Sequence, residues 1–89
     1  MKIKLELFGA SRDFSKDDYL ELEINEKSSI KDLKIELIKY LEKKFNNNEN
    51  FIKIALSSTF CSEKNNIIPE DYKIKSNEKI GIIPPIGGG

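Results

Sequence analysis

The end of the chain carries the residues with the clearest chemical meaning. It reads Ile-Gly-Ile-Ile-Pro-Pro-Ile-Gly-Gly-Gly and stops at Gly89. The two prolines fix φ and lack N–H groups, so they end a strand and keep the following residues extended. Because glycine has no side chain, the last three residues can enter a narrow channel in which a Cβ would clash. The sequence therefore predicts a thin arm whose terminal carboxylate is activated inside another protein.

The composition of the chain argues against most autonomous catalysis. Its 89 residues make one small domain, and 15 acidic and 15 basic side chains leave no net field to attract nucleic acid. Cys61 is the only cysteine and histidine is absent, which excludes a disulfide framework, a Cys/His metal cluster and a Ser-His or Cys-His pair. Apolar runs are far shorter than the roughly 20 residues of a membrane span, and no signal peptide follows Met1. We expect a cytoplasmic protein that binds no metal or cofactor itself.

The first half of the chain predicts strands and a helix that would position this arm. Residues 1–8 and 19–24 alternate apolar and polar side chains, which predicts an antiparallel hairpin joined by a turn or loop at residues 9–18. From residue 30 to 45, apolar side chains recur at spacings of three and four, which predicts one amphipathic helix packed on a sheet. Ser29 and Asp32 predict a capping box at the start of this helix.

The second half of the chain predicts three further strands. Residues 51–56 alternate and predict the third strand, whereas residues 57–66 predict a long polar loop that holds Phe60 and Cys61. The segment 67–69 allows only a short edge strand, because a proline cannot donate to a ladder. The last strand is expected at residues 80–83.

This order of elements predicts the fold class. A hairpin, a crossover helix and returning strands give a mixed sheet with one main helix across one face, which is an α+β roll of the β-grasp, or ubiquitin-like, type. We expect residues 1–86 to form the β-grasp domain and residues 87–89 to form a flexible tail.

Three features of the sequence resemble the small subunit of molybdopterin synthase, within the wider family of ubiquitin-like sulfur carriers that also serves thiamin synthesis. They are Phe8-Gly9-Ala10-Ser11-Arg12 after the first strand, the single central helix, and the Ile-Ile-Pro-Pro-Ile-x-Gly-Gly ending. The likeness covers nearly the whole chain. The ending is the most specific feature, because Pro-Pro and a branched residue before the glycines are typical of the molybdopterin branch.

The resemblance implies a function for the terminal carboxylate. An ATP-dependent E1-like activating enzyme would adenylate Gly89, and a sulfur nucleophile would convert the adenylate to a thiocarboxylate. The large subunit of molybdopterin synthase would then transfer this sulfur to cyclic pyranopterin monophosphate in molybdenum cofactor biosynthesis. The family likeness implies a heterotetramer of two large and two small subunits, in which the carrier contributes sulfur and not the acid-base catalysts.

Candidate site residues follow from the arm and from the resemblance. Gly89 is the reacting residue, and Gly87 and Gly88 give the arm its thinness. The candidate partner contacts are Phe8, Arg12, Phe60, Ile83, Pro84, Pro85 and Ile86. Phe8 and Ile83 fit the core equally well, whereas Phe60, in a predicted polar loop, is the better candidate for the surface. Arg12 offers a guanidinium to a carboxylate on a partner.

Other functions are compatible with the same ending. A lysine amine in place of sulfur would make the chain a ubiquitin-like protein modifier, and thiamin or tRNA thiolation would be a variant of sulfur delivery. A plain interaction module with an incidental tail is a further alternative. Cys61 has no neighbouring histidine or lysine pair in the sequence that would activate it, so we expect an incidental thiol.

Overall fold

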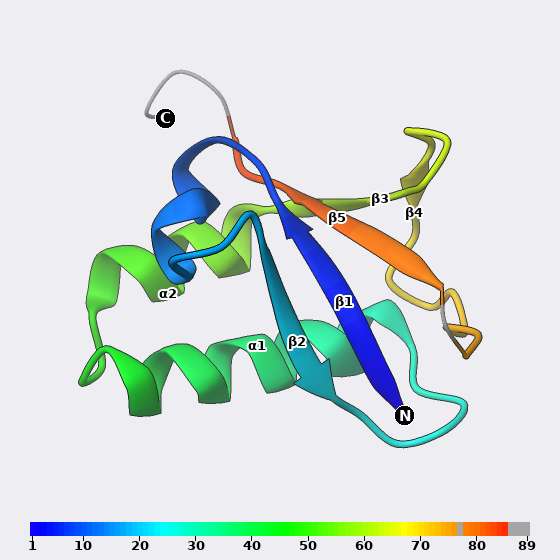
Figure 1. Cartoon of the computed structure of the whole chain (residues 1–89), viewed down its shortest axis with the longest axis horizontal. Coiled ribbons are helices and arrows are strands. Elements are labelled where there is room, and N and C mark those ends of the chain that lie inside the picture. The colour runs from blue at the N-terminus through cyan, green and yellow to red at the C-terminus, as the bar shows by residue number, and fades with distance from the viewer. Residues whose placement is uncertain (77, 86–89) are drawn as a thin grey trace.

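The structure, a computed structural model, describes residues 1–76 and 78–85 (Figure 1). Ile86 and the predicted tail at residues 87–89 lie outside this range. The elements, in chain order, are β1 (Lys2–Leu7), the 3₁₀ helix η1 (Gly9–Phe14), β2 (Tyr19–Glu23), α1 (Ile30–Lys44), α2 (Glu49–Ser57), β3 (Thr59–Ser62), β4 (Ile67–Ile68) and β5 (Lys79–Ile83). No helix among the described residues is long and apolar enough to cross a bilayer.

The five strands form one mixed sheet in the order β2-β1-β5-β3-β4. β1 pairs antiparallel with β2, as the predicted hairpin requires, and parallel with β5, so the last strand returns beside the first. Helix α1 lies across one face of this sheet (Figure 1). Leu33, Leu37 and Leu41 on α1 are fully buried, together with Leu5 and Ile80 on the sheet. The predicted α+β architecture is therefore confirmed.

Residues 51–56 form a helix, so the prediction of a third strand there was wrong. The Asn48 side chain accepts a hydrogen bond from the Phe51 N–H at 3.1 Å and caps α2. At helical spacing, Phe51, Ile54 and Ala55 share one face, and Ala55 is fully buried. The Phe51 ring lies 4.8 Å from the Phe45 ring, centroid to centroid. These aromatic contacts tie α2 to α1, which an alternating strand would not achieve.

The third strand instead lies within residues 57–66, which the sequence predicted to be a polar loop. β3 pairs antiparallel with β5, and Phe60 stands opposite Ile82. Phe60 is only 2% exposed and belongs to the core. The expectation that Phe60 lies in a polar loop was therefore wrong, because four residues flanked by serines suffice for a strand when a long neighbour supplies the ladder.

The predicted loop at residues 9–18 contains η1, which packs two side chains inward. Phe14 and Ser11 are fully buried. The Ser11 hydroxyl donates to the Phe8 carbonyl at 2.6 Å and accepts from the Phe8 N–H at 3.0 Å, so it satisfies the backbone at the end of β1. The Tyr40 hydroxyl donates to the Phe14 carbonyl at 3.3 Å. This segment therefore holds the exit of β1 in place.

Helix α1 begins with the capping box that the sequence predicted. The Asp32 N–H donates to the Ser29 hydroxyl oxygen at 3.2 Å, and the Ser29 N–H donates to the Asp32 carboxylate at 2.9 Å. The helix ends at Lys44, where Asn46 and Asn47 adopt φ values of 53° and 61°. Asparagine tolerates this left-handed region better than most residues, as expected for the asparagine run.

Asp32 gives the fold a pH-dependent contribution to stability. Hydrogen bonds from Ser29 hold the pKa of Asp32 below its ordinary value. Because the pKa is lower in the folded chain, the carboxylate stabilises the fold above the unfolded pKa, and this contribution disappears as the pH falls through the folded pKa. We expect Asp32→Asn to be less stable than the wild type at neutral pH and to converge with it in acid, measured by urea unfolding. Asp71→Asn, at an exposed aspartate, is the control, and equal pH profiles would contradict the assignment.

Candidate functional site

Strand β5 is the central strand of the sheet, and its last residue lies at one end of the sheet. Ile83 is the last residue of β5, and Pro84 is buried beside Gly9, the first residue of η1. A Cβ added to Gly9 would lie 3.9 Å from Cδ and Cγ of Pro84. Gly9 also has a φ of 55°, which favours glycine. Pro84, a candidate partner contact, is buried on its own chain, whereas Pro85 is exposed.

The face of the sheet opposite α1 carries an apolar cluster near the end of β5. A Cβ added to Gly81 would lie 2.8 Å from Cε2 of Phe8 and 2.9 Å from Sγ of Cys61. The Phe8 ring therefore lies over Gly81 and reaches the side of Cys61. Phe8 keeps 39% of its surface exposed, whereas Cys61 keeps 2%. Phe8 is thus a surface residue that shields a thiol, and not a member of the core.

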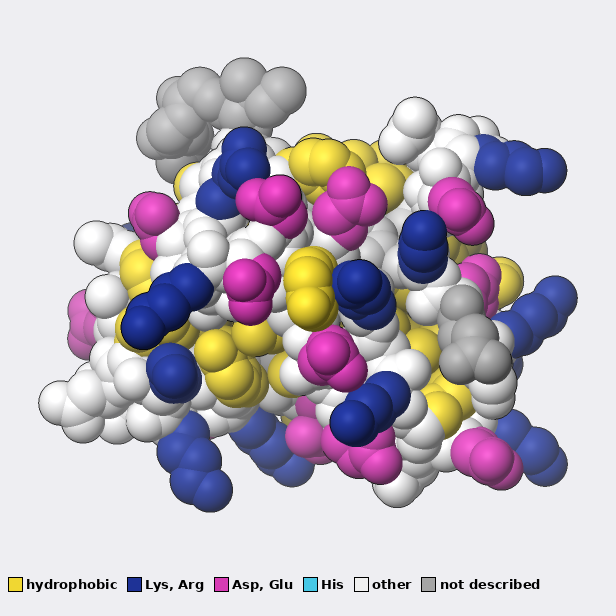
Figure 2. All heavy atoms as spheres, viewed as in Figure 1, with side chains coloured by type: hydrophobic (Ala, Val, Ile, Leu, Met, Phe, Trp, Pro, Cys, Tyr) yellow, Lys and Arg dark blue, Asp and Glu magenta, His cyan; other side chains and the backbone are white. Residues whose placement is uncertain are grey.

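Ile83 lies on the same open face as Phe8. Register pairs Glu6 with Gly81 and Thr59 with Ile83, and alternation along the strands then puts Phe8 and Ile83 on the solvent side. Ile83 is half-buried. Figure 2 shows hydrophobic side chains at the upper rim of the molecule, over β3 and β5, with charges of both signs interspersed elsewhere on that face. Two of the predicted contacts therefore share one surface near the end of β5.

A shallow hollow of about 380 Å³ adjoins this cluster. Its lining combines the Phe8, Cys61 and Gly81 group with polar and charged side chains of neighbouring strands and turns, namely Glu6, Ser62, Glu63, Asn65 and Lys79, and with Ile80. Lys79 and Glu63 approach to 3.9 Å across it. No group of side chains that could hold a metal ion occurs among residues 1–76 and 78–85.

Arg12, the predicted charged contact, already has a partner within the chain. Its guanidinium lies 2.8 Å from the Asp18 carboxylate, and both side chains are largely exposed. An exposed pair of this kind is worth roughly 1 kcal/mol or less, so the guanidinium can exchange Asp18 for a partner carboxylate at little cost. Phe60, by contrast, has no surface to offer, because it is enclosed in the core.

Gly81 is a site residue that reasoning from the sequence missed. A glycine inside an apolar strand indicates a close approach by another group, and that signal is present in Ile80-Gly81-Ile82. The structure identifies the approaching group as the Phe8 ring.

Cys61 is a poor nucleophile in this environment. Burial raises the pKa of the Cys61 thiol, a hydrogen bond involving the Gly81 backbone lowers it, and the charge of Glu6 raises it further. A thiol that stays protonated and covered reacts slowly. Cys61 lies in β3, so its predicted place in a polar loop was wrong, whereas the expectation of an unactivated thiol agrees with this environment.

Phe8→Ala is expected to uncover Cys61. Loss of the ring removes the cover over the thiol, so we expect the rate of alkylation by a maleimide to rise by about tenfold or more. Phe8→Leu should retain most of the cover and serves as the control. The rate would be followed by intact mass under native conditions. Equal rates in the wild type and Phe8→Ala would show that local opening elsewhere, and not Phe8, governs access.

A family model described as the ThiS family matches residues 5–89 of the sequence. The chain belongs to the ThiS family. This match spans nearly the whole chain, including the proline and glycine ending. No curated protein matches the sequence.

Solved structures similar to this ThiS-family chain share its fold. SAMP1 from Haloferax volcanii superposes with a TM-score of 0.67 at 11% identity, covering 100% of both chains. A protein assigned as molybdopterin converting factor subunit 1 from Pyrococcus furiosus superposes with a TM-score of 0.69 at 22% identity, covering 96% of this chain and 98% of that one. At these identities the likeness establishes the fold alone, and it confirms the predicted ubiquitin-like β-grasp.

Proposed function

We propose that this ThiS-family chain is the sulfur-carrying small subunit of molybdopterin synthase. The observation that carries the proposal is how the fold holds the chain up to Pro85. β5 is held between β1 and β3, Pro84 is packed on Gly9, and Pro85 is exposed. The sequence after Pro85 is one isoleucine and three glycines. A rigid body that presents a thin, side-chain-free terminus suits a carboxylate that must react inside other proteins.

In the proposed cycle, the reacting atom is the carbonyl carbon of Gly89. An E1-like activating enzyme transfers AMP from ATP to the carboxylate and releases pyrophosphate. A sulfur nucleophile then attacks the acyl carbon, AMP leaves, and a thiocarboxylate forms. In the large subunit the sulfur passes to cyclic pyranopterin monophosphate, and water restores the carboxylate. The carrier supplies the sulfur, and its partners supply ATP and the acid-base groups; the carrier itself needs no bound cofactor.

The open face near the end of β5 is the proposed contact surface for the large subunit. Phe8 and Ile83 offer apolar area there, and Pro85 extends it toward the terminus. Arg12 adds a cation that a partner carboxylate can recruit from Asp18. Ile86 and the three terminal glycines would continue into the partner's site. We further propose a heterotetramer of two large and two small subunits, acting in the cytoplasm.

The direct test is the intact mass of the protein after incubation with ATP, an activating enzyme and a sulfur source. We expect a fraction in which one oxygen is replaced by sulfur, mapped to Gly89 by fragmentation. Addition of the large subunit and cyclic pyranopterin monophosphate should return this fraction to the original mass. An unchanged mass with a demonstrably active activating enzyme would overturn the proposal.

A ubiquitin-like protein modifier is the second candidate, because it would use the same activated carboxylate. The two functions differ in the nucleophile, which is a sulfur atom in one and a lysine amine in the other. Thiamin or tRNA thiolation would give the same thiocarboxylate but would not discharge to cyclic pyranopterin monophosphate. Lysine-linked heavier species from the native host, detected on a denaturing gel, would favour the modifier.

A further inference from the structure

Strand β2 has a free hydrogen-bonding edge. It is the outer strand of the sheet and pairs only with β1 among the described residues (Figure 1). Two backbone hydrogen bonds, from the Leu7 N–H to the Asp18 carbonyl and from the Ile24 N–H to the Met1 carbonyl, show which residues of β2 bond to β1. Leu20 and Leu22 therefore bond inward to β1, while the N–H and C=O groups of Tyr19, Glu21 and Glu23 point outward. These outward groups form no backbone hydrogen bond to another described residue.

The opposite edge of the sheet is protected in a way that β2 is not. β4 has only two residues and is followed by Pro69, so it presents a short and interrupted ladder. β2 has five residues without a proline. Its only protection is the carboxylate pair of Glu21 and Glu23, which repels an acidic strand but not a basic one.

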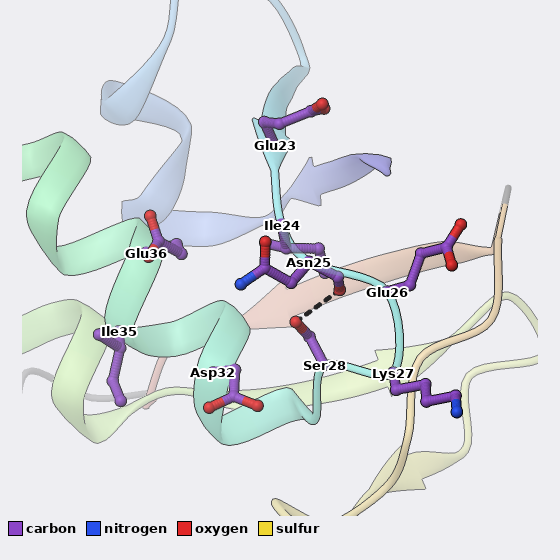
Figure 3. A pocket seen from close by; sticks show the side chains of 9 residues that line it. All are labelled: Glu23, Ile24, Asn25, Glu26, Lys27, Ser28, Asp32, Ile35 and Glu36. Carbon is purple, nitrogen blue, oxygen red and sulfur yellow. Dashed lines mark hydrogen bonds between the residues drawn. The ribbon is translucent and has the colours of Figure 1, made fainter.

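A groove lies between the end of β2 and helix α1 (Figure 3). Its volume is about 530 Å³. Ile35 and Glu36 project from α1 on one side, Glu26 and Lys27 from the loop on the other, and Ser28 bonds to the Asn25 carbonyl between them. Ile35 is 44% exposed, although it is a large apolar side chain. The described lining of the groove is therefore mostly polar and acidic, with Ile35 as its exposed apolar side chain.

Charge in this region is only partly balanced within the chain. Glu21, Glu23 and Glu26 form no ion pair with a described residue, whereas Glu36 lies 3.5 Å from Lys39. Lys2 and Lys4 stand opposite Glu23 and Glu21 in the ladder, but Lys4 Nζ lies 4.0 Å from the centre of the Tyr19 ring. Among the described residues that line the groove, Lys27 is the one cation, and Lys31 and Lys73 act on Asp32 from outside the lining. The carboxylates that form no ion pair favour a positively charged occupant.

Two simpler uses of the groove do not fit. It lies at the start of α1, but the N–H groups there are already bonded, those of Ser29 and Asp32 to each other's side chains and those of Ile30 and Lys31 to the carbonyls of Tyr72 and Glu70. An anion would therefore meet only the Asp32 carboxylate. A second copy of this chain added in antiparallel register at the same edge would bring identical glutamates together, which is destabilising.

We propose that the β2 edge and the groove beside α1 bind an extended, basic segment of a partner protein. The segment would add as a sixth strand beside β2 through the outward backbone groups of Tyr19, Glu21 and Glu23. Alternate side chains would then fall on the two faces of the sheet. Lysine or arginine side chains would lie beside Glu21 and Glu23, and branched apolar side chains would enter the groove next to Ile35.

This surface is separated from the terminus that carries the proposed function. β1 and β5 are parallel and β2 is antiparallel to β1, so the groove lies at the opposite end of the sheet from Pro85. A partner segment can therefore hold the carrier while its terminus reacts elsewhere. The inference goes beyond the proposed function, because it does not require Gly89 to be activated.

A peptide that alternates lysine and valine over roughly eight residues is the probe. We expect titration into ¹⁵N-labelled protein to shift the amides of Tyr19, Glu21 and Glu23 and to slow their hydrogen exchange by about tenfold. The same peptide with lysine replaced by glutamate should not bind. A version N-methylated on its pairing residues should bind at least about tenfold more weakly, because the added strand loses its donors.

Matched variants separate this edge from general charge attraction. Glu21→Gln/Glu23→Gln should weaken binding about tenfold, whereas Glu42→Gln/Asp71→Asn, which removes the same charge elsewhere, should not. Equal weakening in both, unchanged binding of the N-methylated peptide, or shifts confined to the face around Phe8 would overturn the proposal. Intact mass after sulfur loading is independent of this titration, so each proposal can fail alone.

Discussion

Removal of Gly89 is expected to abolish thiocarboxylate formation without unfolding the protein. The deletion leaves a carboxylate on Gly88, but it moves the reacting carbon back by one residue, a distance of up to roughly 3.5 Å. A displacement of about 1 Å in a reacting group can cost roughly 100-fold in rate, so we expect a loss of at least that size. The readout is the sulfur-for-oxygen mass fraction after incubation with ATP, the activating enzyme and a sulfur source.

Two controls make the Gly89 result specific. Addition of one glycine after Gly89 displaces the carboxylate in the other direction, and we expect it to be similarly inactive. Thermal unfolding of both variants should match the wild type, because the buried hydrophobic core of the described residues runs from Ile3 to Ile82 and neither variant alters it. Efficient loading of the shortened chain would show that the position of the carboxylate is not read, which the sulfur-carrier proposal does not allow.

A loss of loading at the terminus must be distinguished from a loss of binding at the surface that contacts the large subunit. Phe8→Ala should leave loading by the activating enzyme detectable but weaken binding of the large subunit, if the open face is the contact that we propose. Gly89 deletion should do the reverse. The two variants therefore test separate parts of one proposal, the reacting end and the surface beside it.

The parts of the fold that the sequence predicts well are those with one consistent period. In α1, apolar residues at spacings of three and four agree with the Ser29 and Asp32 cap and with the asparagine stop, and the helix forms as expected. In β1, apolar and polar side chains alternate strictly, and the structure buries the apolar ones and exposes the polar ones. Local signals at these two elements all favour the same structure.

Residues 51–56 show why the remainder was harder to predict. Ile52, Ile54 and Leu56 alternate as a strand would, yet Leu56 is exposed and the buried member of the segment is Ala55. A short apolar run satisfies both periods, so tertiary packing decides between them. The decision here comes from the Asn48 cap and from the rings of Phe14 and Phe45 on either side of Phe51. Neither ring adjoins Phe51 in the sequence.

The sequence predicts only part of the geometry of the candidate site. The sequence indicates Phe8 and Ile83 as contacts and leaves them between core and surface, because exposure depends on which face the register selects. Register with β5 puts Phe8 over Gly81, which no local pattern determines. Phe60 was assigned to the surface because polar neighbours surround it, although β5 supplies the partner strand that buries it.

Phe60→Ala is expected to lower the free energy of unfolding by about 3–5 kcal/mol, the range for truncating a buried aromatic ring. Phe60 is 2% exposed and stands between Ile82 on β5 and Ile68 on β4, so little rearrangement can fill the space. Phe8→Ala should cost far less, because 39% of that ring is already in solvent. Urea unfolding, followed by circular dichroism, measures both changes.

The comparison stays informative even if Phe60→Ala does not fold, which is plausible for a small domain whose total stability is only about 5–15 kcal/mol. Phe60→Leu retains most of the apolar volume, so its free energy of unfolding should lie between those of the wild type and Phe60→Ala. A loss below about 1 kcal/mol for Phe60→Ala would place that ring outside the core. The expected contrast, a large loss at Phe60 and a small one at Phe8, assigns the first ring to folding and leaves the second free for a partner.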